Sequence, residues 1–139
     1  MLRQLSVFIE NTQGSLADLT EALESRDIII HTLALADASR FGVVRAIVSR
    51  PDQALQAIQE AGYSGCITEV VGVKAPDERA GLTGALKALR ASAIDVEYLY
   101  ILKTHEGTRT LVFGVADTAR TEAALAAAGY DLASEEEVD

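Results

Sequence analysis

The spacing of apolar residues changes repeatedly along the chain, and each change marks an expected element. Leu2 to Ile9 alternates apolar with polar residues, which predicts a strand. Ser15 to Arg26 carries apolar residues on one helical face and acidic residues on the other, so it predicts an amphipathic helix with Ser15 as its N-cap. The residues of the apolar face are Leu16, Leu19 and Leu23.

The rest of the first half continues this alternation of strands and helices. In the strand predicted from Ile28 to Asp37, the apolar residues change from even to odd positions near His31 and Thr32, which indicates a β-bulge. Pro51 suits the first turn of a helix, and Gly62 is typical of the residue that follows one. The predicted elements are a strand from Ile28 to Asp37, a turn from Ala38 to Gly42, a strand from Val43 to Ser49, a helix from Asp52 to Ala61, and a strand from Tyr63 to Thr68.

The second half repeats the pattern of the first without a linker. At an offset of 66 residues the apolar positions coincide, as in the pairs Leu16/Leu82, Leu23/Leu89 and Ile28/Ile94. The tripeptide AGY closes the second helix of each half, after one inserted residue in the second. The predicted elements are a strand from Glu69 to Ala75, a turn from Pro76 to Gly81, a helix from Leu82 to Ala91, a strand from Ile94 to Lys103, a turn from His105 to Gly107, a strand from Thr108 to Val115, and a helix from Thr118 to Ala128.

This duplication predicts the fold class. The order β-α-β-β-α-β is that of a ferredoxin-like unit, in which two helices cover one face of an antiparallel four-stranded sheet. We therefore expect an α+β protein with two ferredoxin-like βαββαβ units in tandem, residues 1–68 and 69–139. Val43 and Ile47 place apolar side chains on the uncovered face, so this face is expected to meet another sheet or another copy, and we expect a homodimer.

Two strand-to-helix turns hold corresponding places in the repeats. ENTQGSL spans Glu10 to Leu16, and PDERAGL spans Pro76 to Leu82. A turn of this kind leaves backbone N–H groups unpaired at a helix N-terminus, which suits a carboxylate or another anion. Arg79 offers a second partner for a carboxylate, but Ala80 accepts a positive φ less readily than glycine. We therefore expect the better ligand site at the first turn.

Composition and charge exclude several classes of function. The 139 residues are 49% hydrophobic, and twelve basic against twenty-one acidic residues give a net charge of −9. No cluster of lysine and arginine is present, which disfavours nucleic-acid binding. No apolar run approaches the roughly 18 residues of a membrane helix, and the start MLRQLSVFIEN does not resemble a secretory signal, so we expect a cytoplasmic protein. The tail from Glu135 to Asp139 is expected to be frayed and solubilising.

The sequence offers little for catalysis or metal binding. Cys66 is the only cysteine and is expected to be a small buried hydrophobe. His31 and His105 lack neighbours at metal-ligand spacing, and no serine lies in a nucleophile motif. We therefore expect neither a metal nor a cofactor, and no enzyme activity.

The repeated pattern resembles the ACT domain, and the whole chain resembles a small stand-alone pair of ACT domains. The resemblance covers about residues 4 to 133. It rests on the segments ENTQGSLADLTEAL, IHTLALADASRFGVVR and ALQAIQEAGY in the first half, and on PDERAGLTGAL, IDVEYLYI and AAGY in the second. Ala80 stands where the family usually has glycine.

The resemblance implies a regulatory role in which an amino acid binds between two ACT copies, at the first strand-helix turn of one copy and the second strand of a neighbour. Carried over by position, the turn residues are Asn11, Thr12, Gln13, Gly14, Ser15 and Leu16 in the first half and Asp77, Glu78, Arg79, Ala80, Gly81 and Leu82 in the second. The facing strand would contribute Leu35, Ala36 and Asp37, or Tyr98, Leu99 and Tyr100. Leu35, Ala36 and the two tyrosines favour an apolar or aromatic amino acid over a charged one.

Several of these residues also have purely structural interpretations. Gly14 permits a strained turn with or without a ligand, and Asn11 can bond to its own backbone. Asp37 and Phe41 can serve strand-end and loop packing alone. Tyr98 and Tyr100 share one sheet face, where packing competes with ligand stacking.

Three functions stay open at this point: a non-catalytic amino-acid sensor, a regulatory subunit or interaction module for a biosynthetic enzyme, and an enzyme on a ferredoxin-like scaffold.

Overall fold

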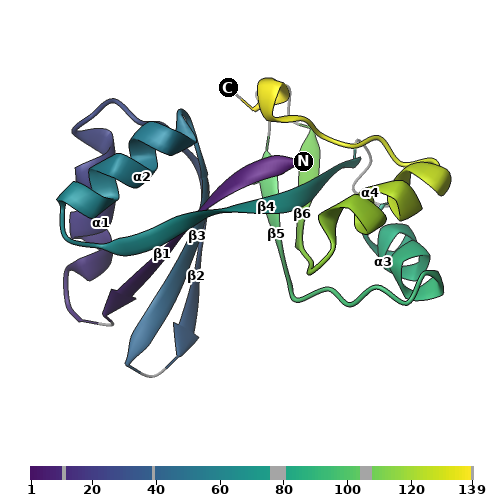
Figure 1. Ribbon diagram of the computed structural model, residues 1–139, viewed down its shortest axis with the longest axis horizontal. Helices are drawn as coiled ribbons and strands as arrows, with labels where there is room; N and C mark the ends of the chain where they lie inside the picture. The colour runs from purple at the N-terminus through teal and green to yellow at the C-terminus, as the bar shows by residue number, and fades with distance from the viewer. Residues whose placement is uncertain (11, 39, 76–80, 104–107, 139) are drawn as a thin grey trace. The chain divides into compact units, whose positions relative to one another are not determined.

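A computed structural model describes residues 1–10, 12–38, 40–75, 81–103 and 108–138 of the chain (Figure 1). The fold is α+β, and its described part contains six antiparallel strands and four helices in a tandem βαββαβ-like pattern, as predicted. In chain order the elements are β1 (Leu2–Glu10), α1 (Ser15–Glu24), β2 (Ile30–Ala38), β3 (Phe41–Val48), α2 (Pro51–Glu60), β4 (Ser64–Ala75), α3 (Leu82–Ala91), β5 (Tyr98–Lys103), β6 (Arg109–Gly114), α4 (Thr118–Ala127) and the 3-10 helix η1 (Glu135–Glu137).

The chain forms two compact units, which we call the first and the second unit. The first contains Arg3–Thr68, and the second contains Glu69–Asp139 together with Met1–Leu2. The last predicted strand of one repeat and the first of the next are a single strand, β4, whose residues 64–68 belong to the first unit and 69–75 to the second. The repeats therefore meet without a connecting loop.

In the first unit the strands follow the order β2-β3-β1-β4, and α1 and α2 cover one face (Figure 1). Its core lies between that face and the helices, and it is formed by apolar residues from strands and helices alike. They include Leu5, Val7, Ile9, Leu19, Leu23, Val44, Ala46 and Ile58. β1 and β3 pair antiparallel with Val7 opposite Val44 and Glu10 opposite Phe41. Because side chains alternate along a strand, Phe8, Glu10 and Phe41 project from the face away from the helices.

The predicted bulge near His31 and Thr32 is confirmed, because the pairing of β2 with β3 shifts register between Ile30 and Thr32. One prediction for this sheet is wrong: Cys66 is exposed. It alternates with the half-buried Gly65 and Ile67, and Ile67 packs against the core, so the Cys66 side chain points away from the helices.

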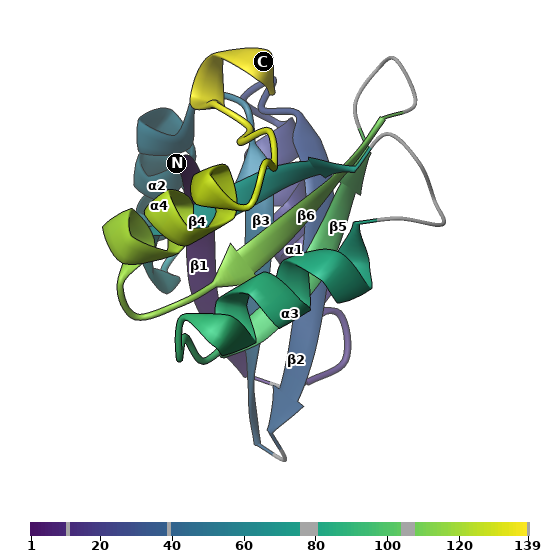
Figure 2. The ribbon, with the colours of Figure 1, turned by 90° about the vertical axis from the view of Figure 1, so that its right-hand side faces the viewer.

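In the second unit β4, β6 and β5 are neighbours in that order, and α3 and α4 cover one face (Figure 2). Phe113 is fully buried in its core, among side chains that include Val71, Val73, Leu89, Leu111 and Leu125. The predicted strand from Ile94 begins only at Tyr98. Ile94 and Val96 still pack against the core from the segment before β5, so their apolar character reflects burial without strand pairing.

The first helix of each unit ends in the same way. Asp27 and Ala93, which are 66 residues apart, have positive φ angles of 57° and 54°. A guanidinium bonds to the helix C-terminus in both units. Arg50 donates to the carbonyl oxygens of Arg26 and Asp27 at 3.0 and 2.6 Å, and Arg120 donates to that of Ser92. A cation there offsets the negative end of the helix dipole.

The C-terminal segment as far as Val138 packs against the second unit, which corrects the prediction of a frayed tail from Glu135 onward. Leu132 forms an isolated antiparallel bridge with Val73, and the Ala133 N–H donates to the Gly72 carbonyl oxygen at 2.8 Å. Farther on, Glu137 in η1 forms an ion pair with Lys74 of β4. The segment thus lies against β4 in the place that a fourth strand would take in the second unit.

This ion pair gives a pH-dependent contribution to stability. The hydrogen bond from Lys74 holds the pKa of Glu137 below its ordinary value. A carboxylate with a lowered folded-state pKa stabilises the protein above its unfolded-state pKa, and this contribution is lost as the pH falls through the folded-state pKa. We expect Glu137→Gln to lower the melting temperature slightly at pH 7, and the difference from the wild type to vanish towards pH 3. Thermal unfolding followed by circular dichroism measures this, with the exposed neighbour Glu136→Gln as control.

Candidate functional site

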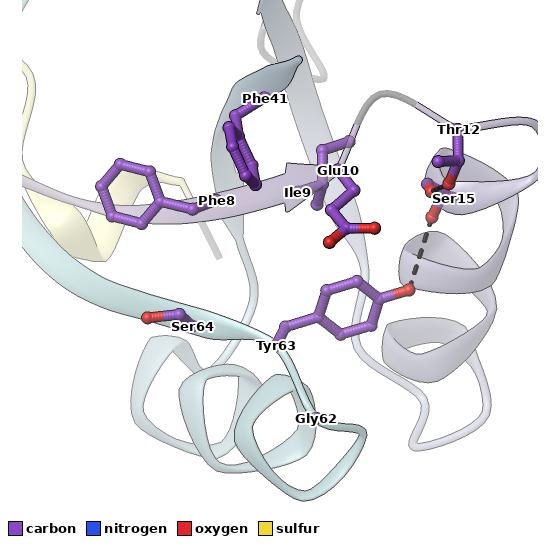
Figure 3. Close-up of a pocket in the computed structure, with 9 residues that line it drawn as sticks. All are labelled: Phe8, Ile9, Glu10, Thr12, Ser15, Phe41, Gly62, Tyr63 and Ser64. Atoms are coloured by element: carbon purple, nitrogen blue, oxygen red, sulfur yellow. Dashed lines mark hydrogen bonds between the residues drawn. The ribbon is translucent and has the colours of Figure 1, made fainter.

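A pocket of about 400 Å³ opens at the predicted first turn, on residues of the first unit alone (Figure 3). It is bounded by the end of β1, the turn into α1, the start of β3 and the junction between α2 and β4. The nine lining residues are Phe8, Ile9, Glu10, Thr12, Ser15, Phe41, Gly62, Tyr63 and Ser64.

The turn that forms one wall is held by its own backbone. The Thr12 N–H donates to the Glu10 carbonyl oxygen at 2.9 Å, and the Ser15 N–H donates to that of Thr12 at 3.2 Å. Gly14 has φ 84°, in the left-handed region that glycine adopts without strain, and it is the N-cap of α1. The predicted N-cap, Ser15, is instead the first helical residue, because the chain turns into the helix at Gly14.

The N-terminus of α1 faces the pocket with hydroxyl groups and no side-chain cap. The Thr12 and Ser15 hydroxyl oxygens are 2.5 Å apart, and Gly14 supplies no side-chain hydrogen bond to the first helical turn. Amide groups at the start of a helix carry partial positive charge. This wall therefore suits a negatively charged group.

The opposite part of the pocket is aromatic and acidic. Phe8 and Phe41 are 52% and 56% exposed, which is unusual for rings of this size, and Glu10 is exposed beside them. Figure 3 shows the Glu10 carboxylate in the middle of the view, with the two phenylalanine rings on one side and Thr12 and Ser15 on the other. The phenylalanine side of the pocket is thus apolar, the side of Thr12 and Ser15 is polar, and the Glu10 carboxylate lies between them in this view.

Tyr63 joins the two sides. Its hydroxyl donates to the Ser15 carbonyl oxygen at 3.4 Å, so its ring is held across the pocket from α1 (Figure 3). Burial raises the pKa of the Tyr63 hydroxyl, and the nearby Asp18 carboxylate adds to that rise. Tyr63 therefore stays a neutral hydrogen-bond donor throughout the physiological pH range.

The structure brings only part of the predicted site together. Thr12 and Ser15 line the pocket, whereas Leu16 packs against the core and Gln13 is exposed outside the lining. Leu35 and Ala36 are exposed on β2, which β3 separates from β1, and they do not line the pocket. Asp37 continues β2 opposite Gly42, and Asn11 lies outside the described residues.

The predicted site of the second half is described only in part. Gly81 is the N-cap of α3 with φ 131°, and Leu82 is the first residue of that helix and 40% exposed. Asp77, Glu78, Arg79 and Ala80 lie outside the described residues.

Tyr98 and Tyr100 stack on each other, with ring centroids 6.5 Å apart and an interplanar angle of 8°. They lie opposite Gly114 and Val112 on the sheet face away from the core residues. A Cβ atom at Gly114 would lie 2.1 Å from the Tyr98 ring, so glycine there makes room for the ring. Their arrangement is that of a packed pair.

Sequence reasoning missed most of the lining. Phe8 lies in the predicted first strand and Glu10 opens the predicted turn ENTQGSL, but neither is among the predicted binding residues. Phe41 is considered for packing, and Tyr63 only as part of the AGY repeat and of a predicted strand. A usable signal was present: Phe8 occupies a polar-face position of an alternating strand, two residues before a carboxylate.

The described residues show neither a metal cluster nor a membrane span. No group of three or more histidine, cysteine, aspartate or glutamate residues in these ranges is placed to hold a metal ion. Every helix in the same ranges is too short or too polar to cross a membrane.

Comparisons with known proteins agree with this architecture. A family model described as an ACT domain pair matches residues 1–139. The crystal structure of protein BT0572 from Bacteroides thetaiotaomicron is similar with a TM-score of 0.89 and 30% identity, covering 99% of this chain and 94% of that one. None of the curated proteins compared with the chain matches it.

Two solved regulatory subunits share the fold at lower identity. The ligand-free regulatory subunit of aspartate kinase from Thermus thermophilus has a TM-score of 0.66 and 15% identity, covering 91% of this chain and 92% of that one. The corresponding subunit from Thermus flavus has a TM-score of 0.63 and 15% identity, with 91% of each chain covered.

Proposed function

Because the chain belongs to the family of ACT domain pairs, we propose that it is a non-catalytic regulatory protein that binds an amino acid at its first strand-helix turn. The division into ACT domains 1–68 and 69–139 and the cytoplasmic location expected from the sequence are parts of this proposal. Regulation by a small molecule is the role that the family and its regulatory neighbours suggest.

The observation that carries the proposal is the pocket at the β1–α1 turn. Its size of about 400 Å³ lies in the usual range for small-molecule sites. The uncapped N-terminus of α1 and the hydroxyls of Thr12 and Ser15 suit the α-carboxylate of an amino acid. The Glu10 carboxylate offers an acceptor for the α-ammonium group.

Thermal unfolding of the purified protein in the presence of each of the twenty amino acids tests the proposal. A ligand that binds only the folded state adds about 2.7 kcal/mol of stability at 100 times its Kd. We expect at least one amino acid to raise the melting temperature by several degrees. If none of the twenty changes the melting temperature, the chain is not an amino-acid sensor.

Gly14→Val locates the site. A Cβ atom at Gly14 meets nothing within 4 Å, but φ 84° is strained for valine. The variant should fold with a loss of about 1–2 kcal/mol and fail to bind the amino acid. The matched control is Gly129→Val, since Gly129 has φ 89°, equally open surroundings and a position after α4 outside the pocket. Undiminished binding by Gly14→Val would place the site elsewhere.

The alternative is a regulatory subunit or interaction module for an amino-acid biosynthetic enzyme. It is favoured by the similarity to regulatory subunits of aspartate kinase, which share the fold. The predicted homodimer stays part of either proposal, and the exposed apolar side chains of the edge strand β5, Leu99 and Ile101, are candidates for its contact. Sedimentation equilibrium measures the oligomeric state.

A further inference from the structure

We infer that the first-unit pocket is specific for amino acids with an apolar or aromatic side chain, that Glu10 binds their ammonium group, and that each chain carries one such site. This inference rests on the proposed function and adds the class of ligand, the residue that binds the ammonium group of the ligand, and the number of ligands per chain. It depends on the chemistry of the lining, on the sheet face that Phe8, Glu10 and Phe41 share, and on a difference between the two repeats.

The lining is negatively charged and aromatic. Among the nine residues described around the pocket, Glu10 is the one charged side chain, and neither lysine nor arginine is present. Three aromatic residues, Phe8, Phe41 and Tyr63, line the same pocket. Ring faces attract cations electrostatically, so they reinforce the carboxylate at an ammonium group. An acidic ligand side chain has no cationic partner in this lining.

The strand register places these groups for a single ligand. Glu10 lies opposite Phe41 in the β1–β3 pair, and Phe8 lies two residues before Glu10 on the same face. An ammonium at Glu10 therefore lies next to the phenylalanine rings on one side. On the other side the Thr12 and Ser15 hydroxyls and the start of α1 receive the carboxylate (Figure 3). The ligand side chain is then directed over Phe8 and Phe41.

The second repeat lacks this chemistry. At the offset of 66 residues, Lys74 takes the place of Phe8 and Pro76 that of Glu10. Lys74 forms the ion pair with Glu137, and its backbone N–H donates to the Asp131 carbonyl oxygen at 2.9 Å. A fixed lysine thus replaces an exposed aromatic ring, and a proline stands at the position that corresponds to Glu10. This difference predicts one ligand per chain.

Isothermal titration calorimetry on the full chain tests the inference with five probes: L-phenylalanine, L-leucine, L-glutamate, L-aspartate and 3-phenylpropionate, which is phenylalanine without its amino group. We expect L-phenylalanine or L-leucine to bind with one site per chain. The two acidic amino acids and 3-phenylpropionate should bind at least about tenfold more weakly, a difference of about 1.4 kcal/mol.

Glu10→Gln removes the charge and keeps the shape of the side chain. It should weaken binding of the apolar amino acid about fivefold and leave that of 3-phenylpropionate unchanged, because that probe has no ammonium group. The control Glu21→Gln changes an exposed glutamate of α1 outside the pocket and should bind as the wild type does. Added salt should reduce the difference between Glu10→Gln and the wild type, since screening weakens exposed charge pairs.

The possible failures can be told apart. If no amino acid binds, both the proposed function and this inference are wrong. If an acidic or polar amino acid binds best, if Glu10→Gln binds the apolar amino acid as tightly as Glu21→Gln does, or if two ligands bind per chain, the protein is still a sensor but this inference is wrong.

Discussion

Replacing Phe113 with alanine is expected to lower the free energy of unfolding by about 3–5 kcal/mol. Phe113 is fully buried and belongs to the second-unit core cluster with Val71, Leu89 and Leu125. The substitution removes apolar surface that folding buries and leaves a cavity that the surrounding strands and helices fill only in part. Both effects destabilise the folded state, and the total free energy of unfolding of a natural domain is only about 5–15 kcal/mol.

Urea unfolding followed by tyrosine fluorescence measures this effect well. Three of the four tyrosines, Tyr98, Tyr100 and Tyr130, lie in the second unit, and the chain has no tryptophan. Phe41→Ala is the matched control, because it makes the same chemical change at a ring that is 56% exposed. A loss for Phe113→Ala no greater than that for Phe41→Ala would contradict the described core.

Gly65→Val is expected to destabilise the first unit by about 3 kcal/mol through overpacking. A Cβ atom at Gly65 would lie 2.6 Å from the Ser6 carbonyl oxygen and 2.6 Å from Cδ1 of Ile58. The Ile58 side chain can rotate away, but the carbonyl belongs to the backbone of the neighbouring strand β1. Relief therefore requires β1 and β4 to separate locally, which weakens the sheet that carries the pocket.

The neighbouring substitution Cys66→Val is the control for Gly65→Val. It introduces the same β-branched side chain one residue later, where the side chain is exposed on the other face. We expect it to change the urea midpoint little, and we expect Gly65→Val to lower both that midpoint and the affinity for the ligand. Equal stability of the two variants would show that Gly65 is not closely packed.

Most of the fold was predictable because apolar spacing and turn residues agree along this chain. The helix from Leu82 to Ala91 has its predicted bounds, and Pro51 begins α2 as expected. The bulge near Thr32 followed from a shift of apolar parity, which is a local signal. The failures are positions where the local pattern fits two structures: Ile94 is apolar because it is buried, although it lies outside the strand.

The candidate site was less predictable because its walls come from distant parts of the sequence. The turn that contains Thr12 and Ser15 was found from a glycine between a strand and a helix. Tyr63 follows Ser15 by 48 residues and reaches it only through the packing of α2 beside α1. Phe8 and Phe41 become neighbours of the turn through strand register, which a single sequence does not specify.

The arginines at the ends of α1 and α3 show how the halves should be compared. Arg50 is the N-cap of α2, but the N-cap of α4 is Asp117, and Arg120 follows it by three residues, where α2 has Gln53. In a residue-by-residue alignment of the two helices, neither arginine is therefore matched by an arginine in the other half. Both guanidinium groups nevertheless bond to the carbonyl at equivalent positions, Arg26 and Ser92. Both halves thus place a guanidinium at the end of their first helix but supply it from different positions in the chain, so a residue-by-residue comparison of the halves is complete only when the atoms that each side chain contacts are compared as well.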